Sequence, residues 1–233
     1  MLPLKDDVPS RSFPLFTVLL VAANVAAFLY QLSLEVGATG PARGAATAFV
    51  MEFGAVPCRL TGLCPTDDFP APFLTIFTSM FLHGGLFHIV GNMLYLWIFG
   101  DNVEDTLGHA RFLVFYLLSG VGAAAAQVLM SPDSRIPMVG ASGAISGVLG
   151  AYLFLFPHAS VLTLITFGFF IRFVQIPAVI VLGFWIVVQV LNGLISTGAA
   201  GREGGVAWFA HIGGFVTGVL LLFLLRPRAN RRL

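Results

Sequence analysis

The sequence predicts an all-α integral membrane protein, a bundle of six transmembrane helices with both termini in the cytoplasm. Its 233 residues are 58% hydrophobic and only 10% charged, and their mean hydropathy is +0.93. Soluble globular proteins carry about 25% charged residues, so this composition excludes a soluble fold. Six apolar segments approach the roughly 20 residues that a helix needs to cross a bilayer. The net charge of +1 gives no electrostatic basis for binding nucleic acid.

The six segments follow one another with short interruptions, except for a long outer loop at residues 33–71. They lie at residues 13–32, 84–100, 112–130, 142–157, 173–196 and 206–225. We expect them to form a single membrane domain over residues 1–233. The apolar stretch 161–171 is too close to Pro157 to cross again, so we expect it at the membrane interface. No internal repeat is evident, which argues against a transporter built from inverted repeats.

The long loop after the first segment holds both cysteines of the chain, Cys58 and Cys64. In the predicted topology both lie on the outer side of the membrane, where oxidising conditions permit a disulfide. A disulfide and two free thiols are equally compatible with the sequence.

Six crossings place both termini on one side, and the basic residues indicate which side it is. The tail at residues 226–233 carries four arginines, and the positive-inside rule makes that side cytoplasmic. Eight of the twelve basic residues then lie inside: Lys5, Arg11, Arg111, Arg172, Arg226, Arg228, Arg231 and Arg232. The other four lie outside: Arg43, Arg59, Arg135 and Arg202. We interpret the tail as a topology signal that also contacts anionic lipid.

The second segment begins within HGGLFHIVGN, which concentrates polar residues at its outer end. His88 and Asn92 are four residues apart and share one helix face. His83 lies about 140° around the helix from His88, so we interpret it as a supporting residue, either catalytic or purely structural. A metal site made of His83, His88 and His211 is the alternative. It is disfavoured because the i,i+4 spacing of helical metal ligands is absent and no acidic or thiol ligand joins them.

The fourth segment begins within VGASGAISGVLG, although glycine is the least favourable helix residue after proline. Its glycines are spaced three, four and three residues apart, at Gly140, Gly143, Gly147 and Gly150. This spacing puts them on one stripe of a helix. In the sixth segment, AHIGGFVTG aligns His211 with Gly214 and Gly218. Small residues at such spacing let two helices approach closely in lipid, so we expect the fourth and sixth segments to pack together.

That contact would bring Ser142 and His211 to similar depth, because both lie in the outer half of the membrane. A serine hydroxyl is a weak nucleophile and needs a general base within about 2.6–3.2 Å. No acidic residue in the membrane segments is placed to orient the histidine, so the sequence predicts a Ser142–His211 dyad. Acyl transfer also needs donors aimed at the developing oxyanion, and His88 and Asn92 supply them. The fourth segment would be about 24 Å long against a core of about 30 Å, which leaves a wet pit above Ser142.

The motifs HGGLFHIVGN, GASGAISG and AHIGGFVTG, in this order across six hydrophobic segments, resemble the rhomboid family of intramembrane serine proteases. The stretch FGDNVEDTLGHARFLVFYLLSG at residues 99–120 is similar to the region after the second transmembrane helix of that family. The resemblance implies a serine endopeptidase with Ser142 as nucleophile and His211 as base, and with no cofactor. It also implies an oxyanion hole made of His88, Asn92 and the Ser142 backbone amide.

The resemblance further implies that the substrate is a transmembrane helix of another protein, cut near its outer end within the lipid bilayer. The fifth segment, at 173–196, and the loop after it would act as a lateral gate and cap. In some members an aromatic residue four positions after the nucleophile stacks on the catalytic histidine, whereas here that position is Ser146. Some members also have a Trp-Arg pair in the first loop, and residues 33–71 contain none. The oligomeric state stays open.

Two other classes of function compete with this hypothesis. A rhomboid-like protein that binds transmembrane clients without cleaving them would be expected to lack Ser142 or His211, and both are present. A transporter would need polar residues along a continuous path, but the inner halves of the predicted helices are almost entirely apolar. We interpret Gln189 and Asn192 as inter-helix hydrogen-bonding residues in preference to a lining of the substrate path. The Ala- and Gly-rich composition favours a prokaryotic plasma membrane.

Overall fold

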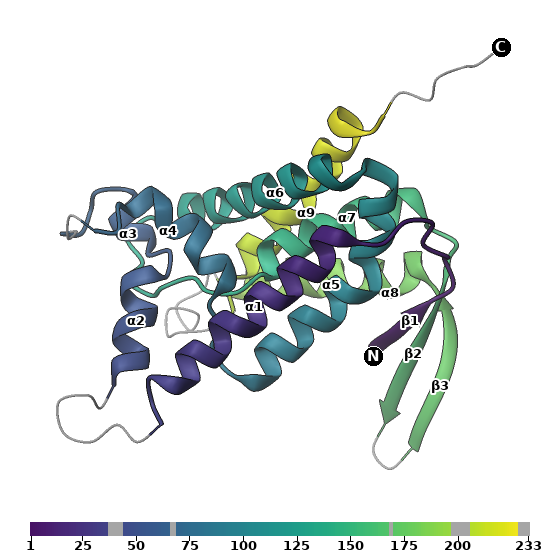
Figure 1. The fold of residues 1–233 in the computed structure, drawn as a ribbon, viewed down its shortest axis with the longest axis horizontal. Helices are drawn as coiled ribbons and strands as arrows, with labels where there is room; N and C mark the ends of the chain where they lie inside the picture. The colour runs from purple at the N-terminus through teal and green to yellow at the C-terminus, as the bar shows by residue number, and fades with distance from the viewer. Residues whose placement is uncertain (37–43, 66–68, 168–169, 197–205, 228–233) are drawn as a thin grey trace.

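The computed structural model describes residues 1–36, 44–65, 69–167, 170–196 and 206–227 as a helical bundle with a small sheet at one end (Figure 1). A helix occurs at each of the six predicted segments: α1 (Leu15–Ser33), α5 (Leu86–Leu107), α6 (His109–Met130), α7 (Ser142–Leu155), α8 (Ala178–Ser196) and α9 (Trp208–Leu225). Arg43, Arg202 and residues 228–233 of the predicted basic tail lie outside the described residues.

The helices differ in their capacity to cross a membrane. By length and composition, α1, α6, α8 and α9 are each long and apolar enough, among the described residues. Helix α5 qualifies as a fifth span together with Pro72–Phe81, to which it is joined at a bend of 84°. Helix α7 is apolar but only 14 residues long. The chain is therefore a mostly helical membrane protein with several apolar helices.

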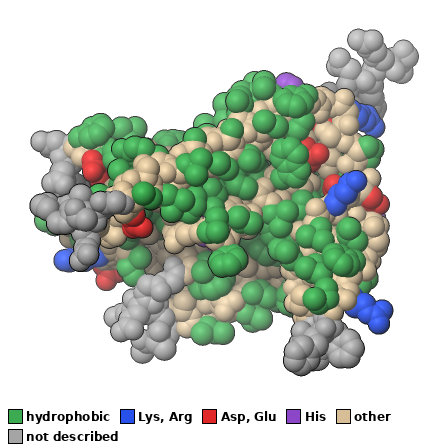
Figure 2. All heavy atoms as spheres, turned by 60° about the horizontal axis from the view of Figure 1, so that its bottom comes forward, with side chains coloured by type: hydrophobic (Ala, Val, Ile, Leu, Met, Phe, Trp, Pro, Cys, Tyr) green, Lys and Arg blue, Asp and Glu red, His purple; other side chains and the backbone are tan. Residues whose placement is uncertain are grey.

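The surface agrees with a position in lipid. Figure 2 shows hydrophobic side chains over the middle of one face, while the charged side chains gather toward its two ends. Outward-facing residues of α8 include Ile180, Phe184 and Val187, each more than half exposed. Such a continuous apolar surface is costly in water and favourable against acyl chains.

The expectation of an all-α fold is wrong, because the chain also forms a three-stranded antiparallel sheet. Strands β1 (Leu2–Asp6), β2 (Ser160–Phe167) and β3 (Phe170–Pro177) lie in that order. Of the apolar stretch 161–171, residues 161–167 lie in β2 and residues 170–171 in β3, while 168–169 lie outside the described residues. The fifth predicted segment, 173–196, is helical only from Ala178, where α8 begins. Residues 173–177 pair with β2 instead. The sequence SVLTLITF is rich in β-branched residues, which favour the pleated conformation.

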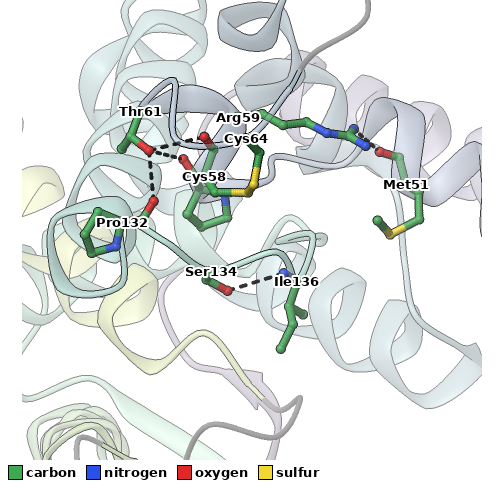
Figure 3. Close-up of a disulfide and its surroundings, with 9 residues drawn as sticks. Met51, Cys58, Arg59, Thr61, Cys64, Pro132, Ser134 and Ile136 are labelled. Atoms are coloured by element: carbon green, nitrogen blue, oxygen red, sulfur yellow. Dashed lines mark hydrogen bonds between the residues drawn. A yellow bond between two sulfur atoms is a disulfide. The ribbon is translucent and has the colours of Figure 1, made fainter.

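The long loop after α1 is folded. It contains α2 (Ala45–Phe53), α3 (Pro57–Leu60), α4 (Pro72–Thr78) and the short 3-10 turn η2 (Ser79–Phe81). Cys58 in α3 and Cys64 just after it form a disulfide (Figure 3). Of the two alternatives that the sequence left open, the structure thus has the disulfide and not two free thiols. Thr61 Oγ1 donates to the carbonyl of Pro132 at 2.9 Å, and the Cys58 amide donates to the carbonyl of Ser134 at 3.0 Å. The first loop therefore holds the connection between α6 and α7.

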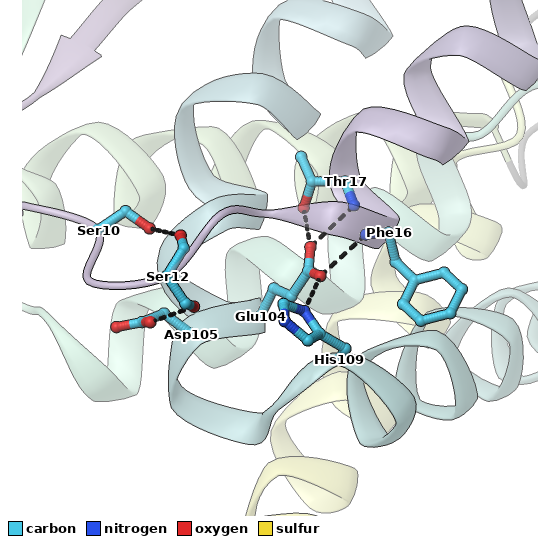
Figure 4. A network of polar contacts seen from close by, with 7 residues as sticks. All are labelled: Ser10, Ser12, Phe16, Thr17, Glu104, Asp105 and His109. Atoms are coloured by element: carbon cyan, nitrogen blue, oxygen red, sulfur yellow. Dashed lines mark hydrogen bonds and ion pairs between the residues drawn. The ribbon is translucent and has the colours of Figure 1, made fainter.

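A buried carboxylate joins the start of α1 to α5. Glu104 is fully buried and accepts hydrogen bonds from the amides of Phe16 and Thr17 at 2.9 and 2.8 Å, and from the Thr17 hydroxyl at 2.8 Å. His109 Nδ1 lies 2.6 Å from the same carboxylate (Figure 4). The first amides of a helix have no carbonyl partner within it, and a carboxylate there satisfies them and complements the helix dipole.

Helices α7 and α9 pack backbone against backbone, as their glycines predicted. A Cβ on Gly214 would collide with the carbonyl oxygen of Gly143, and one on Gly218 would collide with the backbone of Gly147. A Cβ on Gly150 would lie 2.7 Å from the carbonyl oxygen of Phe215. Any side chain at these positions would force the two helices apart.

Gly140 does not belong to this stripe, which corrects the sequence interpretation. Helix α7 begins at Ser142, so Gly140 lies in the loop before it with a φ of 116°. An added Cβ there would lie 2.7 Å from His88 Nε2. Gly140 thus lets the loop approach α5. An added Cβ on Gly143 or Gly147 would first meet Ala123 or Ser119 of α6, whereas one on Gly150 would first meet α9.

We expect Gly214→Ala to lower thermal stability, because the added methyl has no space between α7 and α9. Overpacking of this kind typically costs about 1–3 kcal/mol. Thermal unfolding in detergent, followed by scanning fluorimetry, measures the change. The control is Gly183→Ala in α8, where an added Cβ meets no described atom within 4 Å. Equal melting temperatures for the two variants would contradict the close contact.

Candidate active site

Four of the polar residues that the sequence singled out converge on one cavity. The cavity has a volume of about 1310 Å³, and its lining includes His88, Asn92, Ser142 and His211. These residues come from α5, α7 and α9, and each lies in the first turn or two of its helix. The loop between α6 and α7 and residues of α8 complete the wall.

The serine and histidine are in hydrogen-bond contact. Ser142 Oγ lies 2.8 Å from His211 Nε2, within the reach that a nucleophile and its base require. The two residues are 69 positions apart in the chain, and the glycine contact between α7 and α9 brings them together. The arrangement can transfer the serine proton to the imidazole.

The backbone that leads into Ser142 is held on both sides. Met138 exchanges two backbone hydrogen bonds with Ala55 in the first loop, at 2.8 and 3.1 Å. The amide of Gly140 donates to the carbonyl of Ser79 at 2.9 Å. These bonds define the point at which α7 begins and therefore the depth of the serine.

His211 is oriented by residues of α8 and by one residue of its own helix. Its Nδ1 lies 2.8 Å from Gln189 Oε1. The ring centroid of Trp185 lies 5.9 Å from that of His211, and that of Trp208 lies 6.2 Å away. The interpretation of Gln189 as an inter-helix partner is confirmed. The sequence analysis identified neither tryptophan. The available signal was the position of Trp185 one turn before Gln189, which puts both residues on the same face of α8.

Asn192 does not make the inter-helix bond that the sequence suggested. Its Nδ2 donates to the carbonyl of Val188 within α8, at 2.9 Å, and the residue lines the cavity. Among the described residues, the side-chain hydrogen bond of Asn192 thus stays within α8, unlike that of Gln189, whose oxygen meets His211 of α9.

Two hydrogen-bond donors face the cavity beside Ser142. Asn92 is buried, and its Nδ2 has no partner within the described part of the chain. His88 Nδ1 accepts the amide of Gly84 at 3.3 Å, so a neutral ring carries its proton on Nε2, the nitrogen nearest Gly140. A third donor is the amide of Ser142, since the first amides of a helix have no carbonyl one turn before them.

His83 lies behind His88 and is almost fully buried. The two ring centroids are 5.1 Å apart in an edge-to-face arrangement. Gln31 holds the backbone of His83 through two hydrogen bonds, at 3.0 and 3.2 Å, while neither ring nitrogen has a partner in the described ranges. Across those same ranges, no three His, Cys, Asp or Glu side chains converge as metal ligands would.

The chain has relatives among known proteins. The model of the Rhomboid domain family matches residues 70–228. Rhomboid protein 1, mitochondrial, of Saccharomyces cerevisiae is 31% identical over 157 residues, which are 66% of this chain and 42% of that protein. RHOMBOID-like protein 1 of Arabidopsis thaliana is 36% identical over 156 residues, which are 66% of this chain and 35% of that protein.

A bacterial relative also matches. Rhomboid protease GluP of Bacillus subtilis is 34% identical over 141 residues, which are 60% of this chain and 24% of that protein. The chain thus spans less than half the length of these three relatives. Because two of them come from yeast and from a plant, and one is named as mitochondrial, they conflict with the expectation of a prokaryotic plasma membrane.

We expect a fluorophosphonate probe to react covalently with Ser142, because His211 is placed to remove its proton. Labelling in detergent, read by mass spectrometry of the tryptic peptides, should be lost in Ser142→Ala and in His211→Ala. The matched control is Ser146→Ala, since the Ser146 hydroxyl donates to the backbone carbonyl of Ser142 at 2.6 Å and is engaged there. Labelling that persists in Ser142→Ala would exclude this serine as the nucleophile.

Proposed function

Because the chain belongs to the rhomboid family, we propose that it is an intramembrane serine endopeptidase that cleaves transmembrane segments of other membrane proteins. The observation that carries the proposal is the 2.8 Å contact between Ser142 Oγ and His211 Nε2. The donors beside it, on His88, Asn92 and the amide of Ser142, complete the groups that acyl transfer needs. The structure of the site favours no second function, and a protein that only binds clients would not need a serine and a base in contact.

The proposed reaction proceeds in two halves. His211 Nε2 takes the proton of Ser142 while Oγ attacks the scissile carbonyl, and the carbonyl electrons move onto its oxygen. The imidazolium then protonates the leaving amine as the C–N bond breaks, which leaves an ester on Ser142. Water, deprotonated by the same imidazole, attacks the ester and releases the new carboxyl end. The serine recovers its proton.

The oxyanion of each tetrahedral intermediate would be held by the three donors. Asn92 Nδ2 is a buried donor without a partner among the described residues, so it can donate to the oxyanion without giving up a hydrogen bond to another of these residues. A preorganised donor of this kind stabilises the transition state more than the ground state, because it does not have to leave water first. The glycine at position 140 leaves the space between His88 and the start of α7.

We propose further that all six helices cross the membrane within one domain, residues 1–233, and that both termini are cytoplasmic. Support comes from the charges: Lys5 and Arg172 lie on the sheet at one end of the bundle, while Arg59 lies in α3 and Arg135 lines the cavity. Figure 1 places the sheet and α2–α4 at opposite ends. The positive-inside rule then turns the cavity to the outer side.

Water reaches the proposed site through the open cavity. Helix α7 is about 21 Å long, against a hydrocarbon core of about 30 Å, so Ser142 would begin below the outer membrane surface. Helix α8 borders the cavity through Trp185, Asn192 and Ile195, and much of its opposite side is exposed. We therefore propose that a transmembrane substrate reaches the site past α8, which acts as a lateral gate. The loop proposed as a cap, 197–205, lies outside the described residues.

Purified protein in liposomes should cleave a reporter with one transmembrane helix that contains small and helix-breaking residues near its outer end. Ser142→Ala and His211→Ala should cleave no detectable reporter, because each removes one half of the proton transfer. Gel analysis with mass spectrometry of the products measures the cut. Fully active Ser142→Ala would disprove the mechanism. A wild type that is folded and reacts with the fluorophosphonate but cuts no reporter helix would contradict the proposed substrate class.

Asn92→Ala should lower kcat by about 10²–10³-fold, the scale of one lost oxyanion donor, while the melting temperature stays close to that of the wild type. Steady-state kinetics on the same reporter give kcat and KM separately. Asn24→Ala serves as the control, because Asn24 is a buried amide of α1 that does not line the cavity. An unchanged kcat for Asn92→Ala would remove this residue from the oxyanion hole.

A further inference from the structure

Helix α8 presents two side chains, one turn apart, to the catalytic imidazole. Trp185 and Gln189 are at i and i+4, so they lie on the same face of the helix. The indole lies against one side of the His211 ring, with an angle of 37° between the planes. The amide oxygen of Gln189 lies 2.8 Å from Nδ1, the nitrogen that faces away from Ser142.

The amide of Gln189 can present only its oxygen to the histidine. Its Nε2 donates to the carbonyl of Trp185 at 3.3 Å, which directs Oε1 toward Nδ1. An amide oxygen is an acceptor, so the ring nitrogen opposite must carry the proton. Neutral histidine has one ring proton, and Nε2 is therefore left as the acceptor for the Ser142 hydroxyl, 2.8 Å away.

We propose that Gln189 is the positioning residue of this site: it holds His211 in the one neutral tautomer that can act as a base toward Ser142. The inference rests on the proposed function, since a base is needed only if the serine reacts. Gln189 takes the place of the acidic member of a triad without adding a charge to the membrane interior. Ser146, one turn after the nucleophile, cannot serve, because its hydroxyl donates to the carbonyl of Ser142.

The position of Gln189 makes its hydrogen bond informative about the tautomer. The residue is only 6% exposed, so water does not compete effectively for Nδ1. Without the amide oxygen, the opposite tautomer becomes accessible, in which Nε2–H would donate to Ser142 Oγ and could not accept its proton. Beside the buried side chain of Gln189, an unpaired ring N–H also carries the cost of its desolvation.

The same bond ties the dyad to α8. Asn192, one turn further along, bonds to its own helix, so in this part of α8 the polar link to α9 is at Gln189. A movement of α8 away from α9 at this turn would break the bond and release His211.

Three variants of the full-length protein test the proposal. Gln189→Met keeps the length of the side chain but removes the acceptor. Gln189→Glu restores an acceptor at the same place. Asn24→Leu is the matched control, because Asn24 is also a buried amide whose Nδ2 donates to the carbonyl one turn before it, at 2.8 Å.

Two readouts are taken on each variant. Reporter kinetics separate kcat from KM, and ¹⁵N NMR of protein labelled at histidine reports which ring nitrogen carries the proton. The spectra are taken at about pH 8, where an unperturbed imidazole is neutral. The chain has five histidines, and the His211→Ala spectrum identifies the signal of interest.

We expect wild-type His211 to carry its proton on Nδ1 alone. Gln189→Met should show a mixture of tautomers and a kcat lower by about 10–10²-fold with little change in KM, the scale of one lost buried hydrogen bond. Gln189→Glu should keep the proton on Nδ1 and raise kcat at least about threefold above that of Gln189→Met, because the acceptor is restored even though the bond to the carbonyl of Trp185 is lost. Asn24→Leu should match the wild type in both readouts.

A wild-type proton on Nε2, or a Gln189→Met protein with unchanged tautomer and kcat, would overturn the proposal. So would equal loss of kcat in Gln189→Met and Gln189→Glu, since that pattern indicates packing and not hydrogen bonding. The NMR readout does not depend on turnover. A wild type that cleaves nothing but loses its single tautomer in Gln189→Met would therefore refute the proposed function while supporting the positioning role.

Discussion

The close contact between α7 and α9 is the constraint on which the site depends. Each helix contributes one residue of the Ser142–His211 pair, and a hydrogen bond of 2.8 Å tolerates little variation in their separation. In lipid there is no hydrophobic driving force to press helices together, so close packing of small residues must supply the contact. Glycines on both helices remove the side chains that would otherwise set a wider spacing. Glycine lowers the stability of a helix, and the close contact between the two backbones offsets this loss.

The remaining elements set the depth and direction of the reactive groups. The first loop, which contains the disulfide, binds the chain before Ser142 through Ala55 and thus determines where α7 starts. Gly140 gives α5 room to bring His88 beside that start. At the opposite end of α5, the buried Glu104 links this helix to α1, because its carboxylate accepts hydrogen bonds from the first amides of α1. Asn92 Nδ2 is one of several buried polar atoms without a partner in the described part of the chain, and it is the one that we propose to serve the reaction.

Much of this site could be predicted from the sequence because its signals are local. The glycine spacing of the fourth and sixth segments indicated the helix contact, and the four-residue spacing of His88 and Asn92 indicated a shared face. The sheet could not be predicted in the same way. Short apolar runs such as SVLTLITF are compatible with either a strand or a helix, and β1 pairs with residues about 160 positions away. The partner of Gln189 could not be predicted either. The periodicity of a helix shows on which face a polar residue lies, but not which neighbouring helix packs against that face.

The most direct test of the account is an experimental structure of the protein with a fluorophosphonate bound covalently at the site. We expect phosphorus bonded to Ser142 Oγ, with α7 and α9 still in backbone contact. The phosphoryl oxygen, which stands in for the oxyanion, should lie within about 3.2 Å of His88 Nε2, Asn92 Nδ2 and the Ser142 amide. An adduct whose phosphoryl oxygen points away from all three donors, or one formed on another residue, would contradict the account.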